Sequence, residues 1–195
     1  MQPKMIIVAG PPGSGKSTAF PVNSFEFDYF NADDRAAEIN NGSYQGIPPA
    51  IRTIVNQEYE QFVAEHIVAK KSFVIETTLR TDITFKQAAA AKEAGFQIDM
   101  LYLSAGDLET CITRIIGRAL GGGHSAPVEQ LKKIYQASLN NLPRAISEID
   151  SIRIYDNSFS GKPPEPILEA EFGQLKYVLT PLPEWLANAL TEIKF

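Results

Sequence analysis

Short apolar runs alternate along the chain with stretches whose apolar residues recur at helical spacing. Residues 4–9 read Lys-Met-Ile-Ile-Val-Ala, a continuous run typical of a strand buried on both faces of a parallel sheet. Comparable runs predict further strands at residues 25–30, 72–76, 97–103 and 152–155. The intervening stretches predict helices at residues 16–21, 33–40, 47–70, 83–94, 107–120 and 127–146. This alternation predicts an α/β fold with a mainly parallel sheet flanked by helices.

The pattern changes after Asp156, where the regular alternation stops. A Gly-Gln turn at residues 173–174 separates two apolar stretches and predicts a β-hairpin. The remaining elements are a loop at 160–166, hairpin strands at 167–172 and 175–179, and a terminal helix at 183–193. We expect a single domain over residues 1–195, with a core at 1–156 and a C-terminal appendage at 157–195.

Composition and charge exclude several classes of protein. The chain has 195 residues, with 18 lysines and arginines against 23 aspartates and glutamates, which gives a net charge of −5. Nucleic-acid binding needs a basic face, so we expect no nucleic-acid partner. The single cysteine, Cys111, excludes an internal disulfide and favours a reducing compartment. No apolar run approaches the roughly 18 residues that span a bilayer, and no signal peptide is recognisable. These features predict a cytoplasmic protein without a membrane partner.

A glycine-rich turn after the first predicted strand matches the pattern G-x-x-x-x-G-K-[S/T]. Its glycines let backbone N–H groups surround phosphate oxygens, and the following helix N-terminus favours anions. The lysine is expected to reach the β- and γ-phosphates of ATP, and the following serine to bind Mg²⁺. The predicted nucleotide-binding residues are Gly10, Pro11, Pro12, Gly13, Ser14, Gly15, Lys16, Ser17 and Thr18.

Among proteins with such a loop, a small-molecule kinase fits this chain best. The Asn-Lys-x-Asp sequence that reads guanine in GTPases does not occur, nor does the strand ending in Asp-Glu of an ABC-type ATPase. A kinase needs a base near the acceptor hydroxyl. Asp33 follows the second predicted strand, at the sheet edge where ligands bind in open α/β folds, and is the candidate base. The alternative is a favourable first-turn carboxylate in a helix capped by Asn31.

The third predicted strand ends in Glu-Thr-Thr-Leu-Arg, at the same sheet edge. A glutamate that closes an apolar run needs a partner, which Arg80 or a substrate hydroxyl can supply. Glu76 is therefore a candidate to bind the hydroxyl group of an acceptor. The alternative is a structural Glu76–Arg80 ion pair.

A short helical lid is predicted over about residues 114–127. Arg114 and Arg118 lie four residues apart and share one helix face, which runs into Gly121, Gly122, Gly123 and His124. Two such cations can bind the developing charge on a transferred phosphoryl group. An ordinary solvated basic face and an exposed loop histidine are the alternatives.

Taken together, these motifs resemble the zeta-toxin-like P-loop kinases, most closely their short stand-alone bacterial members. The resemblance spans residues 4–156. It rests on GPPGSGKST at 10–18, NADD at 31–34, VIETTLR at 74–80, RIIGRALGGGHSAP at 114–127 and IYQASLNNL at 134–142. It implies ATP- and Mg²⁺-dependent phosphorylation of the 3′-hydroxyl of the amino sugar in UDP-N-acetylglucosamine, and it raises the expectation of an antitoxin partner.

The resemblance also implies roles for single residues. Lys16 and Ser17 take the phosphate-loop roles, and Asp33 matches the family's catalytic aspartate. The family's Glu-x-Thr-x-Arg stretch, which contacts the sugar nucleotide, falls on Glu76, Thr78 and Arg80. Arg114 matches the first lid arginine. The second aligns near His124 rather than Arg118, so both stay candidates for the catalytic cation.

The sequence therefore predicts a kinase that phosphorylates a hydroxyl group of a small molecule, such as a sugar nucleotide. Two alternatives stay open. One is an ATP-binding switch, or a component of a toxin module, that acts through a protein partner. The other is a kinase of nucleosides or nucleotides.

Overall fold

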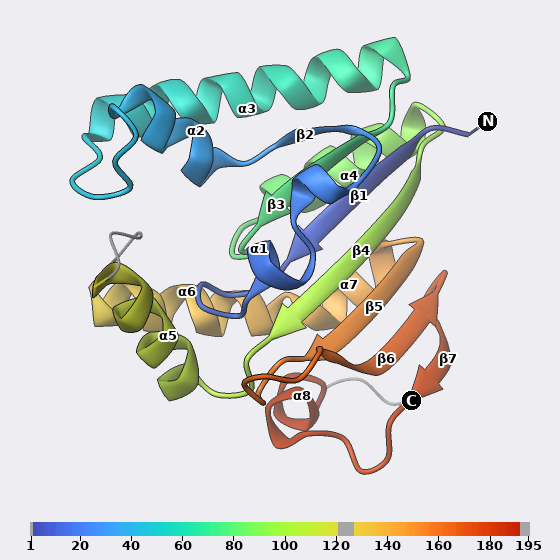
Figure 1. Cartoon of the computed structure of the whole chain (residues 1–195). Helices are drawn as coiled ribbons and strands as arrows, with labels where there is room; N and C mark the ends of the chain where they lie inside the picture. Colours follow the sequence, from blue (N-terminus) through green and yellow to red (C-terminus); the bar gives the residue numbers. More distant parts are fainter. Residues whose placement is uncertain (1, 121–126, 192–195) are drawn as a thin grey trace.

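A seven-stranded sheet organises the computed structural model, which describes residues 2–120 and 127–191 (Figure 1). The strand order is β2-β3-β1-β4-β5-β6-β7, and the first five strands are parallel. The last two pair antiparallel. The strands are β1 (Lys4–Ala9), β2 (Asp28–Phe30), β3 (Phe73–Thr77), β4 (Gln97–Ser104), β5 (Ser151–Asp156), β6 (Glu165–Glu171) and β7 (Gln174–Val178). The predicted α/β fold with a mainly parallel sheet is confirmed.

Helices connect the parallel strands, close to the predicted positions. They are α1 (Lys16–Ala19), α2 (Ala32–Ile39), α3 (Pro49–Ala69), α4 (Ile83–Glu93), α5 (Leu108–Leu120), α6 (Val128–Asn140), α7 (Leu142–Glu148) and α8 (Glu184–Ala189), with a short 3-10 helix η1 (Val22–Ser24). None of the described helices is both long and apolar enough to cross a membrane.

Two predicted elements differ from the structure. The strand expected at 25–30 is limited to β2, because only Asp28, Tyr29 and Phe30 pair with β3. The helix expected at 127–146 divides at Asn141. The Asn141 side chain donates a hydrogen bond to the carbonyl of Leu79 at 2.8 Å, and Pro143 opens α7 without an N–H group to continue the ladder.

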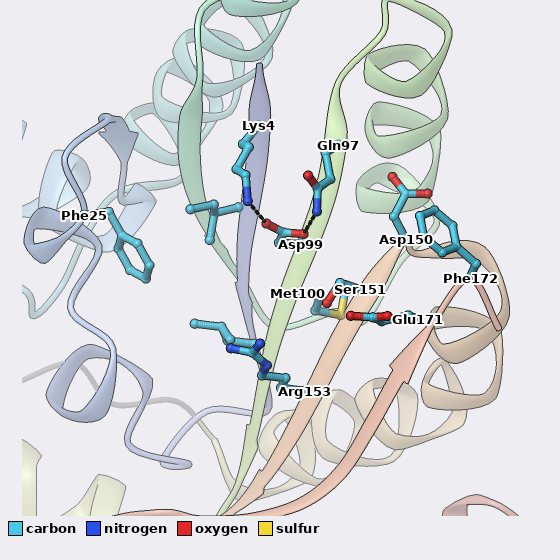
Figure 2. A pocket seen from close by; sticks show the side chains of 12 residues that line it. Lys4, Phe25, Gln97, Asp99, Met100, Asp150, Ser151, Arg153, Glu171 and Phe172 are labelled. Atoms are coloured by element: carbon cyan, nitrogen blue, oxygen red, sulfur yellow. Dashed lines mark hydrogen bonds and ion pairs between the residues drawn. The ribbon is translucent and has the colours of Figure 1, made fainter. Parts of the chain in front are cut away.

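One face of the sheet carries polar side chains. Lys4 of β1 forms an ion pair with Asp99 of β4 at 2.9 Å, and Arg153 of β5 pairs with Glu169 of β6 at 2.8 Å. A depression of about 390 Å³ lies on this face, between Phe25 and the hairpin (Figure 2). Lys4 and Gln97, the first residues of β1 and β4, line it. It therefore lies toward the amino ends of these strands, away from the phosphate loop.

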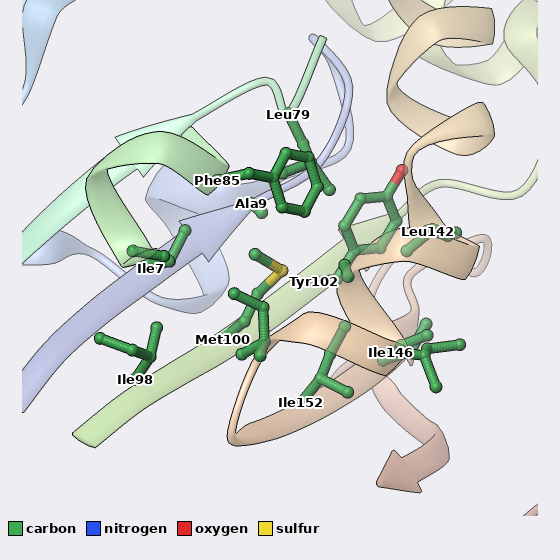
Figure 3. Close-up of a cluster of buried hydrophobic side chains, with 14 of the residues drawn as sticks. Ile7, Ala9, Leu79, Phe85, Ile98, Met100, Tyr102, Leu142, Ile146 and Ile152 are labelled. Atoms are coloured by element: carbon green, nitrogen blue, oxygen red, sulfur yellow. The ribbon is translucent and has the colours of Figure 1, made fainter. Parts of the chain in front are cut away.

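The other face of the sheet carries the main hydrophobic core (Figure 3). Ile7, Met100 and Ile152 project from neighbouring strands and meet Phe85 of α4 and Ile146 of α7. All five side chains are almost fully buried. This packing fixes the central strands, and their carboxyl ends therefore form a rigid edge for the loops that follow.

The C-terminal hairpin and helix belong to the same core. Ile167, Leu168 and Ala170 of β6 and Leu186 of α8 are buried in the cluster that contains the central strands. The chain after residue 156 thus extends both the main sheet and the main core.

Candidate active site

The phosphate loop leaves the carboxyl end of β1 and turns tightly into α1. Gly10 has φ +143°, and a Cβ there would lie 2.0 Å from the carbonyl oxygen of Leu103. Gly13 has φ +79°, and its Cβ would lie 2.4 Å from the carbonyl oxygen of Cys111. Only glycine fits at these positions, because backbone carbonyls of β4 and α5 lie where a Cβ atom would be.

Lys16 lies inside this loop and is 7% exposed. Its Nζ donates to the carbonyls of Gly10 at 2.8 Å and Pro11 at 3.1 Å. Burial lowers the pKa of Lys16, while the carboxylates of Glu76 and Asp33 act in the opposite direction. The loop thus holds the Lys16 ammonium group against its own carbonyls and 3.9 Å from Glu76, where the phosphates of a nucleotide would bind.

The fit to a nucleotide is supported by Ser14. Its Oγ is buried and has no hydrogen-bond partner in the part of the chain that the structure describes. Buried polar groups are nearly always hydrogen-bonded, so such an orphan in a phosphate loop is typical of a site that binds a polar ligand.

Ser17 and Glu76 lie side by side at the edge of the site. The Ser17 hydroxyl donates to Glu76 Oε2 at 3.2 Å, and Lys16 Nζ lies 3.9 Å from Glu76 Oε1. The described residues contain no cluster of three acidic, histidine or cysteine ligands. Mg²⁺ in kinases needs none, since water and phosphate oxygens complete its octahedron around one or two protein oxygens. Ser17 and Glu76 could supply these two.

Asp33 is in the first turn of α2, at the carboxyl end of β2. Asn31 caps this helix as expected, because its Oδ1 accepts from the backbone N–H groups of Asp33 and Asp34. Asp33 Oδ1 accepts a hydrogen bond from Arg52 of α3 at 2.9 Å. Sequence analysis missed Arg52, because it reaches Asp33 from another helix.

Thr78 and Arg80 lie in the loop after β3. Leu79 between them is fully buried with φ +55°, and Asn141 holds its carbonyl. Thr78 is half-buried and Arg80 is exposed. Among the described residues, the ion pair of Glu76 is with Lys16 rather than with Arg80.

Arg114 points toward the loop that follows β5. Its Nη2 donates to the carbonyls of Asn157 at 2.8 Å and Ser158 at 3.4 Å. Asn157 in turn donates from Nδ2 to the carbonyl of Ser14 at 2.8 Å. Asn157 thus connects Arg114 to the phosphate loop, a role that the sequence did not indicate.

Arg118 is exposed one turn further along α5. Its positive charge adds a small contribution, after burial, to the lowering of the Lys16 pKa. The structure does not describe residues 121–126 of the predicted lid. The candidates Gly121, Gly122, Gly123 and His124 therefore lie outside the described residues.

Comparison with known proteins shows the family to which this chain is related. The Zeta toxin family matches residues 1–160. An uncharacterized protein of Haemophilus influenzae is 30% identical over 141 residues, which are 69% of this chain and 94% of that protein.

Solved structures share the fold. The chain is similar to a structure from the PezAT chromosomal toxin-antitoxin system of Streptococcus pneumoniae, with a TM-score of 0.66 and 19% identity over 86% of this chain and 72% of that one. A second match is the complex AvrRxo1-ORF1:-ORF2 with ATP, with a TM-score of 0.70 and 15% identity. That match covers 98% of this chain and 63% of the other, so this chain spans less than two thirds of its length.

Proposed function

The chain belongs to the zeta toxin family of P-loop kinases, and from this premise we propose that it transfers the γ-phosphate of ATP, with Mg²⁺, to a hydroxyl group of a small molecule. UDP-N-acetylglucosamine is the first acceptor to test. Nucleosides and mononucleotides are the second class, because an acceptor site for one nucleotide can accommodate another.

One observation carries this proposal: Lys16, Ser17, Glu76 and Asp33 gather at the carboxyl edge of three adjacent strands. Lys16 would bind the β- and γ-phosphates, and Ser17 with Glu76 would hold Mg²⁺. Asp33 would accept the proton of the acceptor hydroxyl, whose oxygen attacks the γ-phosphorus as the bond to the leaving ADP breaks. Mg²⁺ would neutralise charge on the transferred group.

The acceptor contacts and the lid cations complete the proposal. Thr78 and Arg80, in the loop after β3, are proposed to contact the acceptor. Arg118 and His124 are the candidates for the cation that meets the transferred phosphoryl group. Arg114, bound to the carbonyls of Asn157 and Ser158, is proposed to hold α5 against the phosphate loop.

Phosphorus NMR of the protein with ATP, Mg²⁺ and each acceptor tests the reaction, with Lys16→Ala as the inactive control. We expect a new phosphomonoester signal with one acceptor class and none in the control. Asp33→Asn should lower kcat about a hundredfold or more, as loss of a general base does. Unchanged kcat in Asp33→Asn would remove Asp33 from the mechanism. ATP that stays intact with every acceptor would favour the nucleotide-binding switch.

We also propose a protein partner of the antitoxin kind. The structural relatives include a toxin–antitoxin system and a two-protein complex, and this supports a partner for the present chain. Co-purification from the source cells with and without a non-hydrolysable ATP analogue tests it. Recovery of the chain alone under both conditions would contradict it.

A further inference from the structure

We propose that Arg52 is a positioning residue that holds the carboxylate of Asp33 in the orientation needed to accept the acceptor's proton. The proposal rests on the proposed function, because it assumes that Asp33 is the base. It adds a residue of α3 that no sequence motif had indicated.

Arg52 contacts one of the two carboxylate oxygens of Asp33. Arg52 Nη1 donates to Asp33 Oδ1 at 2.9 Å, and no other described side chain bonds to this carboxylate. As far as the described residues go, one oxygen is therefore occupied, and Oδ2 keeps its lone pairs for an incoming hydroxyl group.

Stability of the fold does not explain the contact. The side chains of Arg52 and Asp33 are 33% and 53% exposed. Ion pairs with this exposure add little to the free energy of folding, because water screens them and two side chains must be ordered. What such a pair does fix is the rotamer of a carboxylate that would otherwise turn freely in solvent.

A second arginine already ties the two helices together. Arg35 of α2 donates from Nε to Glu58 Oε2 at 2.6 Å and from Nη2 to Glu58 Oε1 at 2.9 Å, across the same helix pair. Ala36 of α2 and Val55 of α3 are buried as well. The helices are thus joined without Arg52, and Arg35 provides a matched control with no contact to Asp33.

The experiment compares Arg52→Ala, Arg52→Lys, Arg35→Ala, Asp33→Asn and the double variant Asp33→Asn/Arg52→Ala. The readout is phosphate transfer from Mg-ATP to UDP-N-acetylglucosamine, or to the acceptor that the phosphorus NMR panel identifies. We expect Arg52→Ala to lower kcat about ten- to a hundredfold, as misplacement of a catalytic group does, with KM for ATP unchanged. Arg52→Lys should recover part of kcat, and Arg35→Ala should stay near wild type.

The double variant separates the two proposals. If Arg52 acts through Asp33, Asp33→Asn/Arg52→Ala is no slower than Asp33→Asn alone. A slow Asp33→Asn beside an unaffected Arg52→Ala overturns the role of Arg52 and leaves the base in place. An unaffected Asp33→Asn overturns the base itself. Equal losses in Arg52→Ala and Arg35→Ala indicate a structural effect and also overturn the proposal.

Nitrogen NMR of the arginine side chains tests the contact without any acceptor. We expect slowed rotation of the Arg52 guanidinium in the wild type, restored to free rotation in Asp33→Asn and unchanged in Arg35→Ala. Free rotation in the wild type would overturn the proposal whatever the acceptor is.

Discussion

Lys16 experiences two opposing influences at the centre of the site. Burial lowers its pKa, and the nearby carboxylates of Glu76 and Asp33 raise it. The charged form of Lys16 is the one that attracts phosphates. We therefore expect ATP binding to weaken as pH rises past the pKa that these influences set. Glu76 therefore has a second effect besides the proposed contact with Mg²⁺, because its negative charge opposes the lowering of the Lys16 pKa by burial.

At the residue scale, we predict that Glu76→Gln shifts the pH dependence of ATP binding. Without this carboxylate the pKa of Lys16 falls further below 10.5, since burial is left less opposed. As pH rises from 7 to 10, affinity should begin to weaken at a lower pH in Glu76→Gln than in wild type. Titration calorimetry with ATP at each pH measures this. Glu165→Gln, at an exposed position of β6, is the control, and an equal loss of affinity at high pH in both variants would contradict the prediction.

Site residues whose contacts are local in sequence could be predicted, whereas those with distant contacts could not. The phosphate loop and the cap at Asn31 are contiguous in sequence, so spacing alone located them. Arg52 meets Asp33 across 19 positions, and Asn157 meets Ser14 across 143. No periodicity encodes such contacts, because they exist only once the sheet brings the strand ends together.

At the scale of the elements, the side chain of Asp107 caps the N-terminus of α5. Asp107 Oδ1 accepts from the backbone N–H of Thr110 at 2.7 Å, and this bond lowers the pKa of Asp107. The helix carries Arg114, and the Cys111 carbonyl of this helix lies against Gly13, so we expect loss of the cap to disturb both contacts.

We predict that Asp107→Ala lowers the free energy of unfolding by about 1 kcal/mol at pH 7, the usual contribution of such a cap, and that Asp107→Ser loses less. The folded pKa lies below the unfolded one. The stabilisation is therefore present above about pH 4 and is lost as pH falls through the folded value. Urea unfolding at pH 7 and pH 3 measures it. An Asp107→Ala deficit that is as large at pH 3 as at pH 7 would refute the assignment.

The ends of helices and strands are likewise predictable only where local sequence sets them. The first strand was predicted to the residue, because its apolar run has a turn directly after it. The predicted helix at 127–146 kept its apolar spacing across Asn141, and the break comes from a hydrogen bond to Leu79, a distant residue. Likewise, Phe25 packs near Val22 in a small cluster instead of extending β2.

Over the whole molecule, the C-terminal part is as integral as the rest. The family match ends at residue 160, yet the sheet continues through β6 and β7. Leu168 is 1% exposed and packs in the same core as the central strands. The appendage expected from sequence thus contributes to the stability of the sheet that carries the phosphate loop.

We predict that Leu168→Ala lowers the free energy of unfolding by about 2–5 kcal/mol, the usual result of emptying a buried leucine site. Lys176→Ala, on the exposed strand β7, should change it by less than about 0.5 kcal/mol. Chemical denaturation of both variants provides the comparison. Equal stabilities would show that the hairpin is a peripheral attachment.

The order in which the strands are made differs from the order in which they lie. β1 is synthesised first but sits between β3 and β4, whose residues 73–77 and 97–104 follow much later. Gly10 packs closely against the carbonyl of Leu103. The phosphate loop therefore lacks this contact until Leu103 has left the ribosome. We therefore expect translation products that end before Leu103 to lack the nucleotide site.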